Sequence, residues 1–98
     1  MREFRTAAIR LHVLHHAADR ELHGAWMISE LHEHGHDVGP GTLYPLLHRM
    51  EDAGLLVSRS ETVEGRRRRL YAITDRGCGV LADCRTALGE LAGELLPS

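Results

Sequence analysis

Four consecutive arginines, Arg66, Arg67, Arg68 and Arg69, are the residues of this sequence with the clearest capacity for chemistry. Arginine presents a planar fork of N–H donors that can bind two phosphate oxygens at once, which the ammonium group of lysine cannot do. Side chains alternate along an extended strand, so neighbouring arginines would point to opposite sides. We therefore expect about two or three of the four to reach phosphates or the minor groove of a nucleic acid. The simpler alternative is a solvated, charged turn.

The histidines form a second chemically capable group, because imidazole titrates near neutral pH and binds transition metals. All eight lie before residue 49. His12 and His16 have the i, i+4 spacing that can chelate a metal on a helix, and His32, His34 and His36 crowd the end of another expected helix. A helix C-terminus alone favours histidine, and no cysteine lies close in sequence to complete a typical site. We expect no bound metal and no cofactor, with a metal-responsive site as the alternative.

The two cysteines, Cys78 and Cys84, lie in one expected helix. At about 100° per residue they fall on opposite sides of that helix and cannot form a disulfide with each other. Reduced thiols in a cytosolic protein are the simpler interpretation, and a redox-responsive Cys84 is the alternative.

Length and composition restrict the class of protein. A chain of 98 residues with 43% apolar residues suits one small globular domain. No apolar run approaches the roughly 20 residues of a membrane span, and the charged start does not resemble a signal peptide, so we expect a cytoplasmic protein without a membrane partner. The net charge of −2 argues weakly against nucleic-acid binding, but the clustering of the arginines matters more than the sum.

Apolar residues at spacings of three and four predict three helices, at about residues 3–18, at about residues 23–34 and between Pro40 and Gly54. Proline suits the first turn of the third helix, and glycine suits its end. This third helix has one apolar stripe, formed by Leu43, Leu46, Leu47 and Met50.

After Gly54 the pattern changes to that of strands. Residues 55–60 and 70–73 predict a β-hairpin whose charged tip contains the four arginines. Thr74 can cap a last helix from about residue 75 to residue 95. This order predicts a mainly α (α+β) fold, a winged helix-turn-helix of three helices and a two-stranded β-wing, followed by one C-terminal helix.

A series of spaced residues carries a more specific signature. The matching positions are Gly24, Gly35, the run from Pro40 to Leu47, Arg49-Met50-Glu51, Gly54-Leu55-Leu56, Gly65-Arg66-Arg67-Arg68, Tyr71, Thr74 and Gly77. Over about residues 8–80 this pattern resembles the PadR family of transcriptional regulators. Gly39 departs from it, because the family usually has serine there. Glycine is an acceptable helix cap at a cost of roughly a few tenths of a kcal/mol, so the fold is not in doubt.

The resemblance implies a small bacterial regulator, most simply a ligand- or stress-responsive repressor that binds a palindromic operator as a homodimer. Ending after one further helix, the chain resembles the short branch of the family. Residues 1–74 would be the DNA-binding domain and residues 75–98 the dimerisation helix, within one compact unit.

The outer side of the third helix is the expected DNA-reading surface, because the second helix of a helix-turn-helix meets base edges near its N-terminus. Hydroxyl groups there can bind phosphate, and Arg49 or His48 could bind a guanine edge. The alternative is a solvated helix face, or a Tyr44 packed against the preceding helix. The candidate DNA contacts are Thr42, Tyr44, Pro45, His48 and Arg49, together with Arg66, Arg67, Arg68 and Arg69 of the wing.

The last helix carries an apolar stripe with heptad spacing that has little core left to cover. Pairing with a second subunit is the expected use, and the resemblance implies that the first helix takes part. The expected dimer contacts are Leu11, Leu81, Cys84, Leu88, Leu91 and Leu95. A small-molecule effector could bind at this interface, lined by residues such as Leu11, His12 and Leu88.

Two other classes are less favoured. A protein-interaction module that has lost DNA binding would not need Thr42, Tyr44 and the arginine run. An enzyme is the least favoured class, because the sequence contains no nucleophile–base pair, catalytic metal-ligand spacing or phosphate-binding loop.

Overall fold

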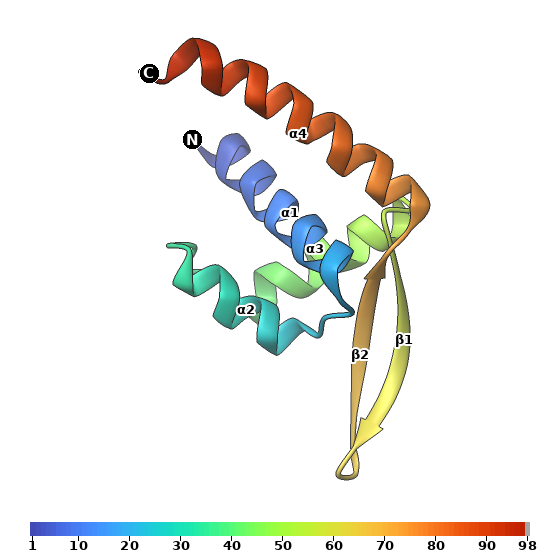
Figure 1. Ribbon diagram of the computed structural model, residues 1–98. Helices are drawn as coiled ribbons and strands as arrows, with labels where there is room; N and C mark the ends of the chain where they lie inside the picture. Colours follow the sequence, from blue (N-terminus) through green and yellow to red (C-terminus); the bar gives the residue numbers. More distant parts are fainter. Residues whose placement is uncertain (98) are drawn as a thin grey trace.

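The computed structural model describes residues 1–97, and within that range the chain forms four helices and one two-stranded antiparallel sheet (Figure 1). The order agrees with a winged helix-turn-helix followed by one helix, so the expected fold class is confirmed. Ser98, the last residue of the expected dimerisation segment, lies outside the described residues. The elements are α1 (Arg2–Asp19), α2 (Gly24–Glu33), α3 (Pro40–Asp52), β1 (Leu56–Val63), β2 (Arg66–Ile73) and α4 (Asp75–Leu95).

The core lies among the first three helices and is closed by the base of the hairpin. The apolar stripe of α3 faces inward as expected, and Leu43, Leu47 and Met50 have no exposed surface. They meet Met27 and Leu31 of α2, which are equally buried. Burial of each such side chain is worth about 1.5–3 kcal/mol, so this stripe fixes how α3 is rotated and which of its residues face the solvent.

The hairpin is longer than the sequence pattern predicts. Its strands are joined by the two-residue turn Glu64-Gly65, with φ angles of 52° and 78°. Positive φ at both turn positions matches the twist of the flanking strands, so cross-strand pairing continues to the tip. The prediction that the arginines lie in the tip between two short strands is therefore wrong. They form the first half of β2, and their cross-strand partners run from Arg66, opposite Val63, to Arg69, opposite Ser60.

Helix α4 begins as the sequence predicts and then extends beside α1 (Figure 1). The Thr74 hydroxyl accepts a 3.0 Å hydrogen bond from the Gly77 amide and donates one of 2.6 Å to the Gly54 carbonyl. This cap ties the start of α4 to the end of α3. Among residues 1–97, no helix is both long and apolar enough to cross a membrane.

Candidate nucleic-acid interface

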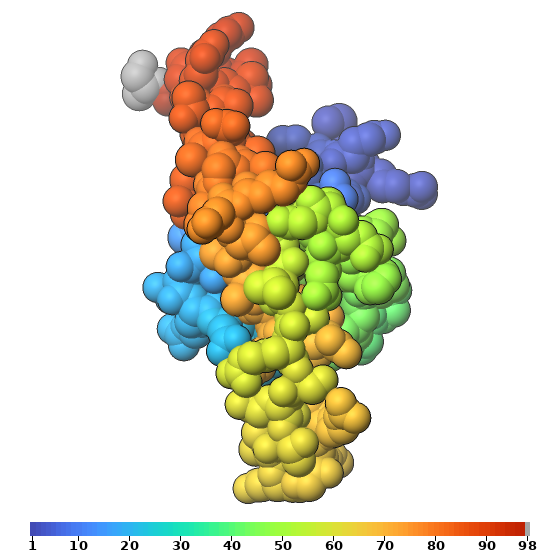
Figure 2. Space-filling model, turned by 90° about the vertical axis from the view of Figure 1, so that its right-hand side faces the viewer, coloured from blue at the N-terminus to red at the C-terminus, as the bar shows by residue number. Residues whose placement is uncertain are grey.

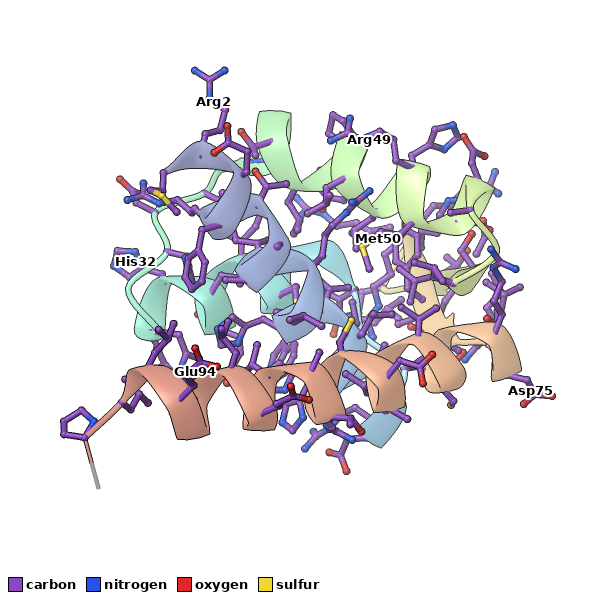
Figure 3. The ribbon with its side chains drawn as sticks, turned by 90° about the horizontal axis from the view of Figure 1, so that it is seen from above. Arg2, His32, Arg49, Met50, Asp75 and Glu94 are labelled. Carbon is purple, nitrogen blue, oxygen red and sulfur yellow. The ribbon has the colours of Figure 1, made fainter. Side chains whose placement is uncertain are left out.

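The outer face of α3 is formed by the residues that the sequence singled out. Because the apolar stripe points into the core, all five candidates, Thr42, Tyr44, Pro45, His48 and Arg49, are exposed. Figure 3 shows Arg49 projecting outward from α3, whereas Met50 lies on the inner side. The Nε2 atom of His48 lies 3.4 Å from the Asp52 carboxylate, which orients this imidazole one turn from the helix end.

Tyr44 is both exposed and packed. Its side chain keeps 44% of its surface exposed, while its ring covers Gly24, the first residue of α2. A Cβ atom at Gly24 would lie 2.5 Å from the hydroxyl oxygen of Tyr44. Tyr44 is therefore packed against the preceding helix, one of the alternatives weighed from the sequence, and it still keeps exposed surface on the outer face of α3.

A cleft of about 520 Å³ lies between the wing on one side and the start of α2 and Tyr44 of α3 on the other. Tyr44 lines one side, and the arginines of β2 line the other. The start of α2 also lines the cleft. There His23 Nδ1 accepts a 3.3 Å hydrogen bond from the Trp26 amide and caps the helix. A helix N-terminus carries partial positive charge that attracts anions. The cleft lining is His23, Gly24, Ala25, Tyr44, Val63, Glu64, Arg66, Arg67, Arg68 and Arg69.

The four arginines of β2 have different partners. Arg68 Nε donates a 2.8 Å hydrogen bond to the carboxylate of Glu61, its cross-strand neighbour. Arg69 instead donates to the Ser58 hydroxyl at 3.1 Å, and Arg67 to the Ser60 hydroxyl at 3.4 Å. Alternation along the strand places Arg67 and Arg69 on one face and Arg68 on the other. The charge of Arg68 is thus partly neutralised, while the other two are only oriented by hydroxyl groups.

The base of the wing is attached to the helices by contacts that the sequence did not reveal. Arg59 of β1 donates two 2.8 Å hydrogen bonds to the carboxylate of Glu21, in the loop between α1 and α2. The same loop pairs with β2, because Leu22 and Tyr71 exchange backbone hydrogen bonds of 2.8 and 2.9 Å. The hydrogen bonds from Arg59 hold the pKa of the Glu21 carboxyl below its usual value. Figure 2 shows the wing as a narrow projection beyond this attachment.

Ser58 attaches the wing to α3 in the same way. Its amide donates a 3.1 Å hydrogen bond to Glu51, and its hydroxyl donates to the same carboxylate at 2.8 Å. Glu51 lies in the last turn of α3, so these bonds fix β1 directly to the helix that carries the candidate contacts. Sequence reasoning named Glu51 only as part of the family pattern, and it predicted no positioning role for Glu21, Glu51, Ser58 or Arg59.

At the other end of the molecule, α1 and α4 border an apolar hollow of about 420 Å³. Of the expected dimer contacts, Leu88, Leu91 and Leu95 are 54%, 50% and 67% exposed, whereas Leu11 and Cys84 are half-buried. Leu81 differs from the expectation, because it is 4% exposed and belongs to the core of its own chain. Heptad spacing alone cannot separate the turn of α4 that covers the core from the turns that extend past it.

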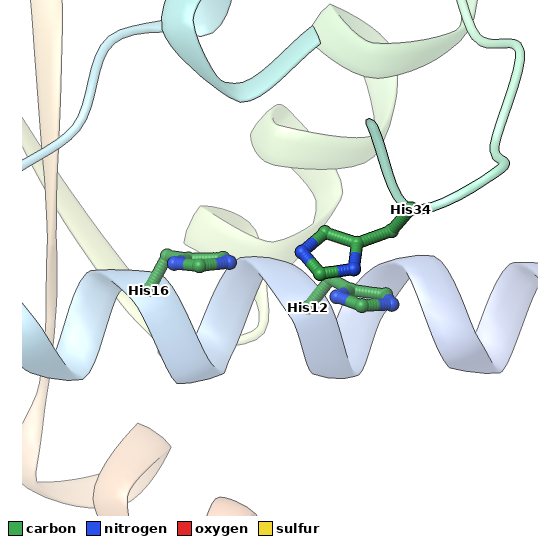
Figure 4. Close-up of side chains that lie close together, drawn as sticks. All are labelled: His12, His16 and His34. Atoms are coloured by element: carbon green, nitrogen blue, oxygen red, sulfur yellow. The ribbon is translucent and has the colours of Figure 1, made fainter. Parts of the chain in front are cut away.

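Three histidines, two from α1 and one from the C-cap of α2, come together beside this hollow. His12 and His16 lie on one face of α1, and the ring of His34, at the end of α2, lies next to them (Figure 4). Burial, and next the neighbouring His34, lower the pKa of His12. Burial also lowers the pKa of His16, against the opposing effect of Glu30.

Comparison with known proteins identifies this arrangement. Residues 13–83 match the family described as the transcriptional regulator PadR-like family. The transcriptional regulator Rv3488 of Mycobacterium tuberculosis is 59% identical over 96 residues, which span 98% of this chain and 90% of that protein. A PadR family transcriptional regulator from Eggerthella lenta is 30% identical, with a TM-score of 0.80 over 98% of this chain and 88% of that chain.

The Bacillus subtilis PadR structure in complex with operator DNA aligns with a TM-score of 0.71, at 22% identity, over 78% of this chain and 44% of that chain. This likeness shows a shared fold. The resemblance seen in the sequence is confirmed by the family match. The expectation that the chain is not an enzyme is confirmed as well, because the family and the relatives are transcriptional regulators.

Proposed function

The chain belongs to the PadR-like family of transcriptional regulators, and we propose that it is a homodimeric repressor that binds a palindromic operator in the cytoplasm. One observation carries this proposal. Tyr44, on the exposed face of α3, and the arginines of β2 border one cleft, in a fold shared with a protein whose structure contains operator DNA. A recognition helix beside a positively charged wing is the arrangement that a DNA duplex can occupy.

In this proposal α3 lies in the major groove, with its N-terminal half inserted most deeply. Thr42 and Tyr44 supply hydroxyl groups to phosphates, and Pro45 packs against the edge of the groove. His48 and Arg49, one turn further along, can donate to the O6 and N7 acceptors of guanine. The contact set therefore combines positioning contacts at the start of α3 with base reading in its middle.

The wing supplies charge. Arg67 and Arg69 face away from the carboxylate of Glu61 and are oriented by serine hydroxyls, so they are the arginines best prepared for phosphates or a narrow minor groove. Arg66, next to the turn, lines the same cleft as the other three arginines. Arg68 must give up its bond to Glu61 before it can contribute fully.

Dimerisation by α1 and α4 completes the proposal. Leu88, Leu91 and Leu95 form an exposed apolar stripe that is continuous with the hollow between α1 and α4. A second copy of the chain presents the same stripe and the same hollow, so each subunit can fill the hollow of the other about a two-fold axis. Such a dimer spaces two recognition helices for two half-sites, about 34 Å apart on the duplex.

The hollow is also the natural place for an effector. Its volume of about 420 Å³ is within the size range of small-molecule sites, and Leu11, His12 and Leu88 line it. An apolar ligand held there would touch both helices that form the proposed dimer.

Fluorescence anisotropy with DNA from the chain's own promoter region tests the proposal. We expect saturable binding at a stoichiometry of two chains per site, weakened at least tenfold by His48→Ala with Arg49→Ala, a pair that removes both base-reading side chains. Asp75→Ala, an exposed change at the start of α4, serves as the control. A chain that binds neither this DNA nor random duplex would instead support the protein-interaction module.

A further inference from the structure

We propose that His12, His16 and His34 form a binding site for a divalent transition-metal ion of the zinc type, with Glu30 as the fourth ligand. Each histidine offers one ring nitrogen, and these three atoms all lie within 4.8 Å of one another (Figure 4). The sequence shows the i, i+4 pair and, separately, a group of histidines at the end of the second helix, and from the sequence alone we expect no bound metal. The fold supplies the third ligand from the C-cap of α2.

Two distances from Glu30, to His16 and to His34, are close to those of a tetrahedral site. With metal–ligand bonds of about 2.0–2.1 Å, the ligand atoms of a tetrahedral zinc site lie roughly 3.3 Å apart. The Glu30 Oε1 atom lies 3.5 Å from His16 Nε2 and 3.2 Å from His34 Nε2, close to that separation. His12 is the ligand that must move closer. Its half-buried ring and the exposed ring of His34 can make this adjustment by rotation about their side-chain bonds.

The ligand set selects the kind of metal. Three imidazoles and one carboxylate suit zinc and its first-row neighbours, whereas calcium and magnesium prefer oxygen ligands. A ligating imidazole must be neutral, and burial favours the neutral form of His12 and His16. Glu30 brings one negative charge to the dication and is the carboxylate in contact with both His16 and His34.

The surrounding groups define the edge of the site. His36 packs edge-on against His12 with ring centroids 5.2 Å apart, and the ring of His15 lies 4.9 Å from that of His16. The Nδ1 atom of His15 accepts a 2.9 Å hydrogen bond from Arg85 of α4, which directs this ring nitrogen toward α4 rather than toward the site. A metal held by the three histidines would cross-link α1 to the end of α2, directly before the turn that leads into α3.

Titration of the full chain with ZnCl₂ in the presence of a competing chelator tests the site, with no DNA present. We expect one Zn²⁺ per chain and a rise in the melting temperature on binding. Co²⁺ in place of Zn²⁺ should give the intense visible bands of a tetrahedral centre. The His16→Gln, His34→Gln and Glu30→Gln variants should each bind at least tenfold more weakly, because each loses one of the four ligands.

His32→Gln is the matched control, because His32 is exposed on α2 and lies outside the cluster. It should bind Zn²⁺ like the wild type. Circular dichroism of each variant separates loss of a ligand from loss of folding, and His34→Gln, at an exposed position, keeps the test available if His16→Gln unfolds. Equal affinity in the wild type and in His34→Gln, or a loss in His32→Gln as large as that in His16→Gln, would overturn the proposal.

Discussion

The ring of Tyr44 occupies the space that any side chain at Gly24 would need, since a Cβ atom there would lie 2.5 Å from both Cε1 and the hydroxyl oxygen of the ring. This contact joins the first residue of α2 to the exposed face of α3. The position of the Tyr44 ring, a candidate DNA contact, thus depends on the absence of a side chain at Gly24. The match of Gly24 to the family pattern has a physical reason in this packing.

Replacing Gly24 with alanine should displace the ring of Tyr44 and weaken operator binding. Because the ring is 44% exposed, it can swing away, so we expect a small loss of melting temperature and a larger loss of DNA affinity. A double-mutant cycle measures this coupling: Gly24→Ala should cost much less DNA affinity in a Tyr44→Ala background. Equal losses in both backgrounds would show that the alanine acts elsewhere.

Local sequence signals predict the elements well, because their causes are local. Pro40 and Gly54 mark the ends of α3 within about two residues, and Thr74 marks the start of α4 through a hydrogen bond to Gly77, three residues away. The exposed face of α3 follows from the spacing of its apolar residues alone. All five candidate contacts on this helix are exposed as expected.

Relationships between distant segments could not be predicted in this way. Arg59 and Glu21 are 38 positions apart in the sequence. No pattern in the sequence around either residue predicts that they form an ion pair. Arg68 and Glu61 become partners only through the hairpin register, which the two-residue turn sets. Leu81 has the same heptad spacing as Leu88, and only the three-dimensional position of α4 assigns one to the core and leaves the other exposed.

The arginines of β2 should contribute unequally to DNA binding. Replacing both Arg67 and Arg69 with alanine should weaken binding to all sequences and lower the slope of log K against log salt by about two, one per phosphate contact. Arg68→Ala should have a smaller effect, because its charge is already paired with Glu61. Anisotropy titrations at several salt concentrations measure both quantities.

Glu61→Gln provides the opposite test of the same pairing. Removal of the carboxylate releases Arg68, so we expect tighter DNA binding and a steeper salt slope by about one. Glu33→Gln, an exposed change on α2, controls for the change in net charge. If Glu61→Gln binds no more tightly than this control, the bond between Arg68 and Glu61 does not limit DNA binding.

Gly77 should resist substitution even though it lies in a helix. Alanine is favoured over glycine in helices by about 0.8–1 kcal/mol, but a Cβ at this position would collide with the backbone carbonyl of Leu55 and crowd Ile73. Overpacking of this kind costs about 1–3 kcal/mol, so the net change in Gly77→Ala should be a loss of stability. Gly79→Ala, where nothing in the described part of the chain lies within 4 Å, should be neutral or stabilising. Thermal unfolding of the two variants decides the point.

The bond between Glu21 and Arg59 should make stability depend on pH. Because the hydrogen bonds from Arg59 lower the pKa of Glu21, the unfolded chain binds a proton at this residue more readily than the folded chain. The stabilisation is therefore present above pH 4.5, the ordinary pKa of the group, and is lost as the pH falls below it through the folded value. Glu21→Gln should melt at a lower temperature than the wild type at pH 7, and the difference should shrink toward pH 3.5. A difference that persists at that pH would point to lost packing rather than to the ion pair.

The exposed leucines of α4 should control both assembly and DNA binding. Leu88→Ser with Leu91→Ser removes two apolar side chains, each worth about 1.5–3 kcal/mol when a second subunit buries it. Both are at least half exposed in the single chain, so the variant should keep its fold by circular dichroism while size-exclusion chromatography with light scattering shows a monomer. Loss of the dimer should also weaken operator binding, because a monomer presents one recognition helix instead of two. Glu90→Ser, about 130° around the helix from this stripe, should stay dimeric and bind as the wild type does. A wild-type monomer at micromolar concentration, or a dimeric double variant that still binds, would mean that α1 and α4 do not form the proposed dimer.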